Sequence, residues 1–60
     1  MKLSEIKRGG MYIVTYHEKG FGHITIITKM CTKKQFLKEL TGKDSKEITR
    51  ICKEAVFYDL

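Results

Sequence analysis

The sequence predicts a small α+β domain of ββαβ order, in which an antiparallel hairpin is followed by one helix and a C-terminal strand. Three observations predict this fold. Two segments rich in β-branched and aromatic residues, 11–17 and 23–28, flank a turn that contains glycine. A helix-capping pattern at Thr32 begins an amphipathic segment, and a further β-branched stretch follows it at 47–58. The 60 residues leave room for one domain, which we expect to span residues 1–60.

Residues 1–28 are expected to form a helical turn and a β-hairpin. Leucine and isoleucine three positions apart predict one turn of helix over residues 3–7. The strands are expected at Met11–His17 and His23–Thr28, because aromatic and β-branched side chains favour extended backbone. Between the strands, Gly20 and Gly22 supply the positive φ that a tight turn needs.

A two-residue turn in this hairpin decides which side chains share a face, because side chains alternate along each strand. The more aliphatic face is the predicted core, and it comprises Met11, Ile13, Thr15, Ile24, Ile26 and Thr28. The other face comprises Tyr12, Val14, Tyr16, His23, Thr25 and Ile27. With one helix to cover one face, this second face is expected to be left uncovered.

One amphipathic helix is expected at Lys33–Thr41. Thr32 followed three residues later by Gln35 forms a capping box, and Gly42 is placed to end the helix. The apolar stripe expected on the sheet consists of Phe36, Leu37 and Leu40. The lysines expected to point into solvent are Lys33, Lys34 and Lys38.

The segment after this helix is open to two interpretations. We favour a strand at Glu47–Lys53, running on through Tyr58, because the segment is rich in β-branched and aromatic residues. This strand is expected to lie beside the first strand, parallel to the second, with the first strand in the centre. The alternative is a second helix, giving ββαα, in which Asp44 or Ser45 caps a helical repeat. The residues of that repeat are Ile48, Ile51, Cys52 and Ala55.

The charge distribution indicates an anionic partner. The net charge is +5, and residues 19–53 carry most of the lysines and arginines. The lysines expected to contact phosphates are Lys19, Lys29, Lys33, Lys34 and Lys38. The side chains expected to stack on bases are Tyr12, Tyr16, Phe21 and His23.

Residues 19–26, Lys-Gly-Phe-Gly-His-Ile-Thr-Ile, resemble the octapeptide signature of the RNA recognition motif, K/R-G-F/Y-G/A-F-V-x-F/Y. The resemblance implies binding of single-stranded RNA on an open sheet. His23 and Ile26 stand where that family stacks bases on aromatics, and the chain is shorter than the family's βαββαβ domain. The order of hairpin, helix, glycine and then residues 47–51 is also similar to the small dimeric uracil-DNA glycosylase inhibitors of phages. That resemblance implies a dimer that blocks a host enzyme, although those inhibitors are acidic and this chain is basic.

Two functions of different class follow from these patterns. The first is a basic, non-catalytic nucleic-acid-binding accessory or regulatory protein. The alternative is a regulator or inhibitor from a phage or mobile element that dimerises and docks on a host protein through its open sheet face. Salt-sensitive binding to DNA or RNA would distinguish the first from the second.

Other classes of function are not indicated. The two cysteines and two histidines lack the close spacing of zinc ligands, so no metal or cofactor is expected. No paired carboxylates, activated nucleophile or phosphate loop is present, so we expect no enzyme and no small-molecule substrate. The longest uncharged run, 21–28, is too short to span a bilayer, and the first residues lack a signal-peptide pattern. The expected location is therefore the cytoplasm of a bacterial cell.

Overall fold

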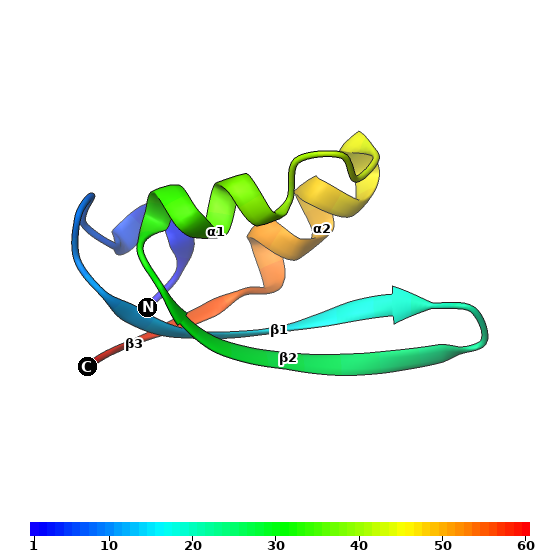
Figure 1. Ribbon diagram of the computed structural model, residues 1–60, viewed down its shortest axis with the longest axis horizontal. Helices are drawn as coiled ribbons and strands as arrows, with labels where there is room; N and C mark the ends of the chain where they lie inside the picture. Colours follow the sequence, from blue (N-terminus) through cyan, green and yellow to red (C-terminus); the bar gives the residue numbers. More distant parts are fainter.

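Two helices lie on one side of a three-stranded antiparallel sheet in the computed structural model, which describes residues 1–60 (Figure 1). The elements in chain order are a 3₁₀ turn η1 (Leu3–Glu5), β1 (Tyr12–Gly20), β2 (His23–Cys31), α1 (Lys33–Glu39), α2 (Ser45–Glu54) and β3 (Val56–Asp59). The α+β class, the hairpin and a C-terminal strand are therefore as predicted. Neither helix is long and apolar enough to cross a membrane.

The hairpin joins β1 and β2 through a two-residue turn at Phe21 and Gly22. Gly22 has a φ of +71°, which a residue with a side chain rarely adopts, whereas Gly20 lies in β1 without a positive φ. The expected positions of this turn were Lys19-Gly20 or Gly20-Phe21, so it falls slightly later in the chain, and both strands are longer than predicted. The predicted division of the strand side chains between the two faces of the hairpin is nevertheless confirmed, because Tyr16 is paired with Ile27 and Val14 with Lys29.

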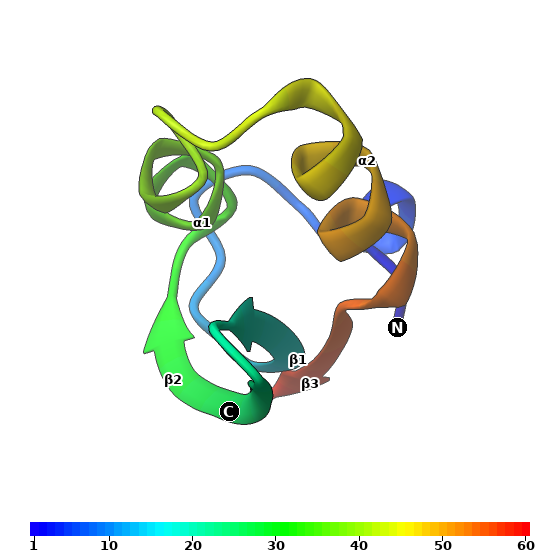
Figure 2. The same cartoon turned by 90° about the vertical axis from the view of Figure 1, so that its right-hand side faces the viewer.

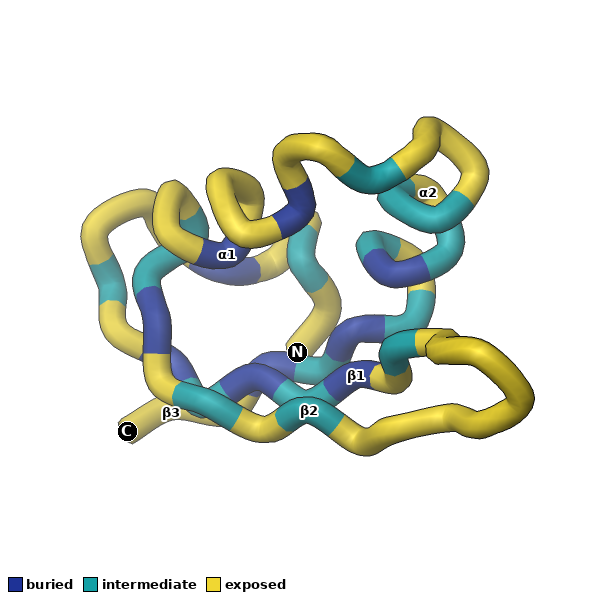
Figure 3. The backbone as a smooth tube through the Cα atoms, turned by 45° about the vertical axis from the view of Figure 1, so that its right-hand side comes forward, coloured by how far each residue is buried: buried dark blue, intermediate teal, exposed yellow.

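The prediction of which face forms the core is wrong. The helices cover the face that bears Tyr12, Val14 and Tyr16, which are 6%, 0% and 3% exposed. Aromatic rings bury more apolar area than aliphatic side chains, and edge-to-face packing adds to their stabilisation. The ring of Tyr16 packs edge-on to Phe36 with centroids 5.7 Å apart, and Phe36 packs edge-on to Phe57 at 5.1 Å. The aliphatic face predicted as the core is the one that no helix covers (Figure 3).

The helix α1 begins as the sequence predicts. The Thr32 hydroxyl accepts a hydrogen bond from the Gln35 backbone at 3.2 Å, and the Gln35 side chain accepts one from the Thr32 backbone at 2.9 Å. Gly42 follows the helix with a φ of +98°. Phe36 is buried in the core, while Leu37, which was predicted to share its stripe, is exposed.

The strand predicted at Glu47–Lys53 is wrong, because these residues form helix α2. The Asp44 carboxylate caps the helix by accepting a hydrogen bond from the Glu47 backbone at 2.9 Å. Arg50 forms ion pairs one turn away on either side, at 2.9 Å to Glu47 and 2.6 Å to Glu54. The propensity cost of isoleucine and threonine in a helix is only about 0.5 kcal/mol each. The cap and the ion pairs outweigh this cost, and the third strand is confined to Val56–Asp59.

The predicted strand order is confirmed. The sheet runs β2-β1-β3, with β1 in the centre, and β3 is antiparallel to β1 and hence parallel to β2. Viewed along the hairpin, α1 lies over β2, and α2 lies beside α1 on the side nearer β1 and β3 (Figure 2). Ile51 of α2 and Leu40 after α1 are buried in the same core as the strand aromatics. The chain therefore has two layers, with helices on one side of the sheet and an uncovered face on the other.

Candidate interaction surfaces

The uncovered side of the sheet, here called the open face, is apolar over most of its length. Its side chains come from alternate positions of the three strands, with two basic residues toward the hairpin tip, and they are Ile13, Thr15, His17, Lys19, Ile24, Ile26, Thr28, Met30, Val56 and Tyr58. Ile24, Ile26 and Met30 are 65%, 66% and 64% exposed, and Tyr58 is 54% exposed. Isolated exposed apolar residues are common on proteins, but several adjoining on one flat face are typical of an interaction site.

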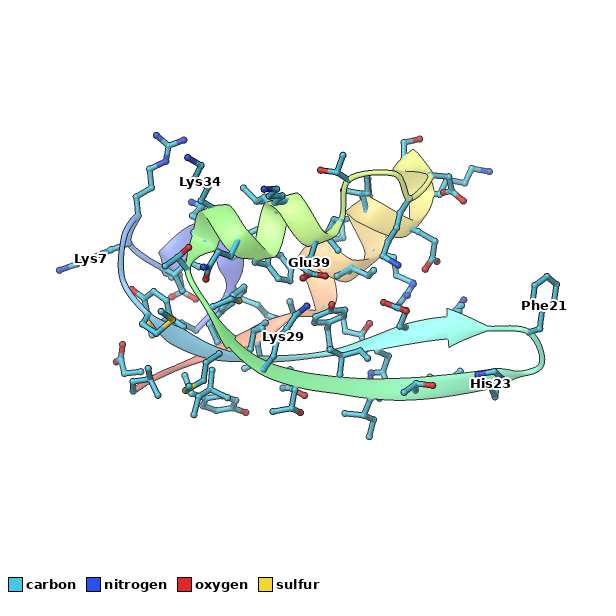
Figure 4. The ribbon with its side chains drawn as sticks, in the orientation of Figure 1. Lys7, Phe21, His23, Lys29, Lys34 and Glu39 are labelled. Carbon is cyan, nitrogen blue, oxygen red and sulfur yellow. The ribbon has the colours of Figure 1, made fainter.

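The tip of the hairpin presents Phe21 to solvent with no contact that buries it (Figure 4). His23 lies beside it, and the Nδ1 atom of its ring is 2.9 Å from the carbonyl oxygen of Phe21. The same ring lies over Gly20, where a Cβ atom would come within 2.7 Å of it. Of the predicted stacking side chains, Phe21 and His23 therefore both lie at the hairpin tip, with His23 packed against the turn.

Tyr12 and Tyr16 have to be removed from the predicted site. Both rings are buried beneath the helices, so neither can stack on a base in the folded protein. The Tyr12 hydroxyl accepts a hydrogen bond from the Lys7 backbone at 2.9 Å, which satisfies its polar end inside the core. No local sequence signal separates these two tyrosines from surface aromatics.

The predicted lysines divide into separate groups. Lys33 and Lys34 lie with Arg8 around a depression of about 530 Å³ at one end of the molecule. Lys29 and Lys38 line a second groove of about 620 Å³ between β2 and α1. Lys19 lies beside the hairpin turn and lines neither of these two depressions. Sequence reasoning missed Arg8, although the Lys7-Arg8 pair before two glycines is a local basic signal.

Lys29 is held by Glu39 across the groove between β2 and α1, with the two charged groups 3.2 Å apart (Figure 4). Burial by itself would lower the pKa of Lys29, but the hydrogen bond to Glu39 and neighbouring charges raise it above its usual value. Lys29 is therefore a fixed cation on the helix side of β2, whereas Lys38 is exposed and has no acidic partner.

A charged cluster ties α2 to β1 beyond the end of β3. Arg50 donates a hydrogen bond to the backbone carbonyl of His17 at 3.1 Å, and the His17 ring contacts the Glu54 carboxylate. Hydrogen bonding from Arg50 lowers the pKa of Glu47. Because these contacts satisfy the exposed end of β1, we interpret the cluster as structural.

The two cysteines are free thiols. Burial raises the pKa of Cys31 and of Cys52, so both favour the protonated form, which is the less reactive one. The structure contains no group of three or more histidine, cysteine or acidic side chains arranged to hold a metal ion.

Comparison with known proteins returns no match: no family model, no curated protein and no solved structure is similar to this chain. The eight residues that resemble the RNA-binding signature span the β1–β2 turn. The functional argument therefore depends on the surfaces of this chain alone.

Proposed function

We propose that this chain is a non-catalytic regulatory protein that acts by binding other proteins, and that it dimerises through its open face. The exposure of Ile24, Ile26 and Met30 on one side of the sheet carries the proposal. Full burial of one such side chain stabilises a complex by about 1.5–3 kcal/mol, so covering the face is favourable. Its aliphatic character suits another protein surface better than nucleotide bases, which stack on aromatic rings.

Charge favours a second copy as the occupant of this face. The unpaired lysines lie on the helices, at the loop before β1 and at the hairpin tip, while the centre of the open face carries no charge. Two copies can therefore meet face to face without bringing their helix lysines together. Sheets packed in this way lie about 10 Å apart with interdigitated side chains.

The size of the face sets the expected affinity. The molecule measures 33 Å along its longest axis, which follows the hairpin in Figure 1, and 15 Å along its shortest axis, which is the viewing direction of that figure. These dimensions give a projected area of roughly 500 Å² per copy, below the ~800 Å² per partner of standard interfaces. Interfaces below the standard size are typical of weak and transient association, so a dimer that dissociates on dilution is expected.

Sedimentation analysis over a range of protein concentrations tests the proposal. The wild-type chain should form a dimer that dissociates on dilution, and Tyr58→Lys should shift the equilibrium at least tenfold toward monomer. Leu37→Lys is a matched control, because Leu37 is an exposed apolar residue on α1, on the opposite side of the molecule. A wild-type chain that stays monomeric at ~1 mM, or equal effects of the two variants, would contradict a dimer through this face.

Binding of nucleic acid is the second candidate function. Among the basic side chains only Lys29, Lys43 and Arg50 form ion pairs with acids. The cluster of Arg8, Lys33 and Lys34 therefore presents unneutralised charge in one depression. Phe21 and His23 at the hairpin tip are the remaining exposed side chains among those predicted to stack on bases.

Fluorescence anisotropy with single- and double-stranded DNA and RNA tests this candidate. Binding should weaken by more than tenfold between about 50 and 200 mM salt, because neutralised phosphates release counterions. Lys33→Glu combined with Lys34→Glu should abolish it, while Lys46→Glu on α2 should have a smaller effect. No binding to any of the four nucleic acids at the lower salt concentration would rule the candidate out.

A further inference from the structure

Two of the exposed backbone edges of the sheet are capped at one residue each by groups of the chain itself. On β3, the Met1 amino group donates to the Phe57 carbonyl at 2.6 Å, and the Phe57 backbone donates to the Met1 carbonyl at 2.7 Å. Where β1 extends beyond β3, Arg50 donates to the His17 carbonyl. Proteins protect sheet edges in this way because an unpaired edge is a template for another strand.

The outer edge of β2 has no such protection. Gly20 and His23 flank a two-residue turn and form a hydrogen-bonded pair, so alternate residues of β2 direct their backbone groups toward β1. The backbone groups that point outward belong to Ile24, Ile26, Thr28 and Met30. No other element of the chain pairs with this nine-residue strand on that side. It contains no proline, and its single lysine is bound to Glu39 on the helix side.

A groove runs alongside the C-terminal half of this edge. Helix α1 lies above β2 when the molecule is viewed along the hairpin (Figure 2), and the groove between them has a volume of about 620 Å³. The residues that line it are Lys29, Met30, Cys31, Gln35, Lys38 and Glu39. A strand edge with a helix beside it can receive an extended peptide, which gains affinity from main-chain hydrogen bonds and specificity from alternate side chains.

We propose that the free edge of β2 binds an extended segment of a partner protein as an added fourth strand, and that this segment alternates apolar and acidic residues. Side chains of the added strand on the open-face side lie next to Ile24, Ile26 and Met30, which selects apolar residues. Side chains on the other side face the groove, where Lys29 is neutralised by Glu39 and Lys38 has no acidic partner, so an acidic residue is favoured beside Lys38. This proposal shares with the proposed function only the premise that the partner is a protein. Dimerisation through the open face would leave the outer edge of β2 free in each copy.

Charge argues for a foreign segment over the β2 strand of a second copy. Each copy has a net charge of +5, and the unpaired charge in the groove belongs to Lys38. A second β2 strand brings no acidic residue to that groove, because none occurs between His23 and Cys31. An acidic segment is attracted to the same surface at long range as well as in the groove.

The experiment uses a fluorescein-labelled ten-residue peptide that alternates valine and glutamate, with the ¹⁵N-labelled full chain as receptor. Anisotropy should report saturable binding, and amide shifts should concentrate at Ile24, Ile26, Thr28 and Met30. The same peptide with lysine in place of glutamate should not bind. A peptide N-methylated on the backbone nitrogens that face β2 should bind at least tenfold more weakly, because it cannot donate to the strand edge.

Two variants separate this inference from dimerisation. Lys38→Glu should weaken peptide binding at least tenfold without changing the dimer, while Lys46→Glu on α2 changes charge equally and should have less effect. Tyr58→Lys changes the open face on β3. The affinity of this variant for the peptide should be unchanged, whether or not the dimer is lost. Peptide-induced shifts centred on the β1 and β3 residues of the open face, Ile13, Val56 and Tyr58, equal binding of the N-methylated peptide, or no shifts at ~1 mM peptide would overturn the proposal. Shifts that arise on concentrating the chain alone, and that are confined to β2 and spare Ile13, Val56 and Tyr58, would identify the β2 edge of a second copy as the occupant and would overturn it too.

Discussion

The same truncation made at two isoleucines tests which face of the sheet is the core. Ile51→Ala deletes three carbon atoms from a site that is 0% exposed, and Ile26→Ala deletes the same atoms from one that is 66% exposed. At about 0.8 kcal/mol per buried CH₂ the Ile51 change loses roughly 2.4 kcal/mol of transfer energy, and the cavity raises this to about 3 kcal/mol. About a third of Ile26 is buried, so its truncation should cost about 0.8 kcal/mol.

Urea denaturation followed by circular dichroism measures both free energies of unfolding. In thermal unfolding, the Ile51 variant should lose about 12–24 °C in Tm, because 1 kcal/mol corresponds to about 4–8 °C in a domain of this size. If Ile51→Ala does not fold, Ile51→Val and Ile26→Val retain the contrast at about 1 and 0.3 kcal/mol. The measurements are made at two protein concentrations, because a dimer through the open face would make only the Ile26 cost rise with concentration.

A cost at Ile26 that equals or exceeds the cost at Ile51 at the lower concentration would refute the assignment of faces. Ile24, Ile26 and Met30 would then belong to the core, and the open face would not be an interaction surface. The comparison uses one amino-acid type, so differences in side-chain chemistry cannot produce the result.

Three further predictions concern the helices and the thiols. Asp44→Ala should lower the free energy of unfolding by about 1 kcal/mol through loss of the α2 cap, whereas Lys46→Ala in the same helix should change it by less than about 0.5 kcal/mol in urea titrations. The lowered pKa of Glu47 contributes stability that is present above the ordinary pKa of a glutamate and is lost as the pH falls through the lowered pKa. Glu47→Gln should therefore flatten the dependence of stability on pH between pH 5 and 2. At pH 7 both thiols should react with Ellman's reagent more slowly than free cysteine. Cys31, which is 4% exposed, should react more slowly than Cys52. Equal rates for the two thiols would contradict the difference in their burial.

The parts of the fold that were predicted correctly have local causes. A glycine at the turn, alternating β-branched residues and a threonine–glutamine capping box each act within a few residues of where they occur. Helix α2, with its cap at Asp44, was the less favoured of the two interpretations of this segment for the opposite reason. Its isoleucines and threonine favour a strand when counted singly, while its cap and its ion pairs depend on Asp44, Glu47, Arg50 and Glu54 acting together once a helix exists.

The candidate site was predicted only in part. Phe21, Lys33, Lys34 and Lys38 lie where a partner could reach them, because turn tips and the polar side of a capped helix are exposed in most folds. The tyrosines were misplaced, and Ile24, Ile26 and Met30 were assigned to the core. No local pattern distinguishes the two faces of this hairpin, since both are half apolar.

The sequence by itself determined the hairpin, its pairing parity, the first helix and the excess of positive charge. Tertiary structure decided which face of the hairpin became the core, because that choice depends on how two helices and β3 pack against it. Once α2 exists, the rings of Tyr16, Phe36 and Phe57 meet at centroid distances near 5–6 Å and exclude water together. The aliphatic face and the edge of β2 are left outside because the chain has no further element to cover them.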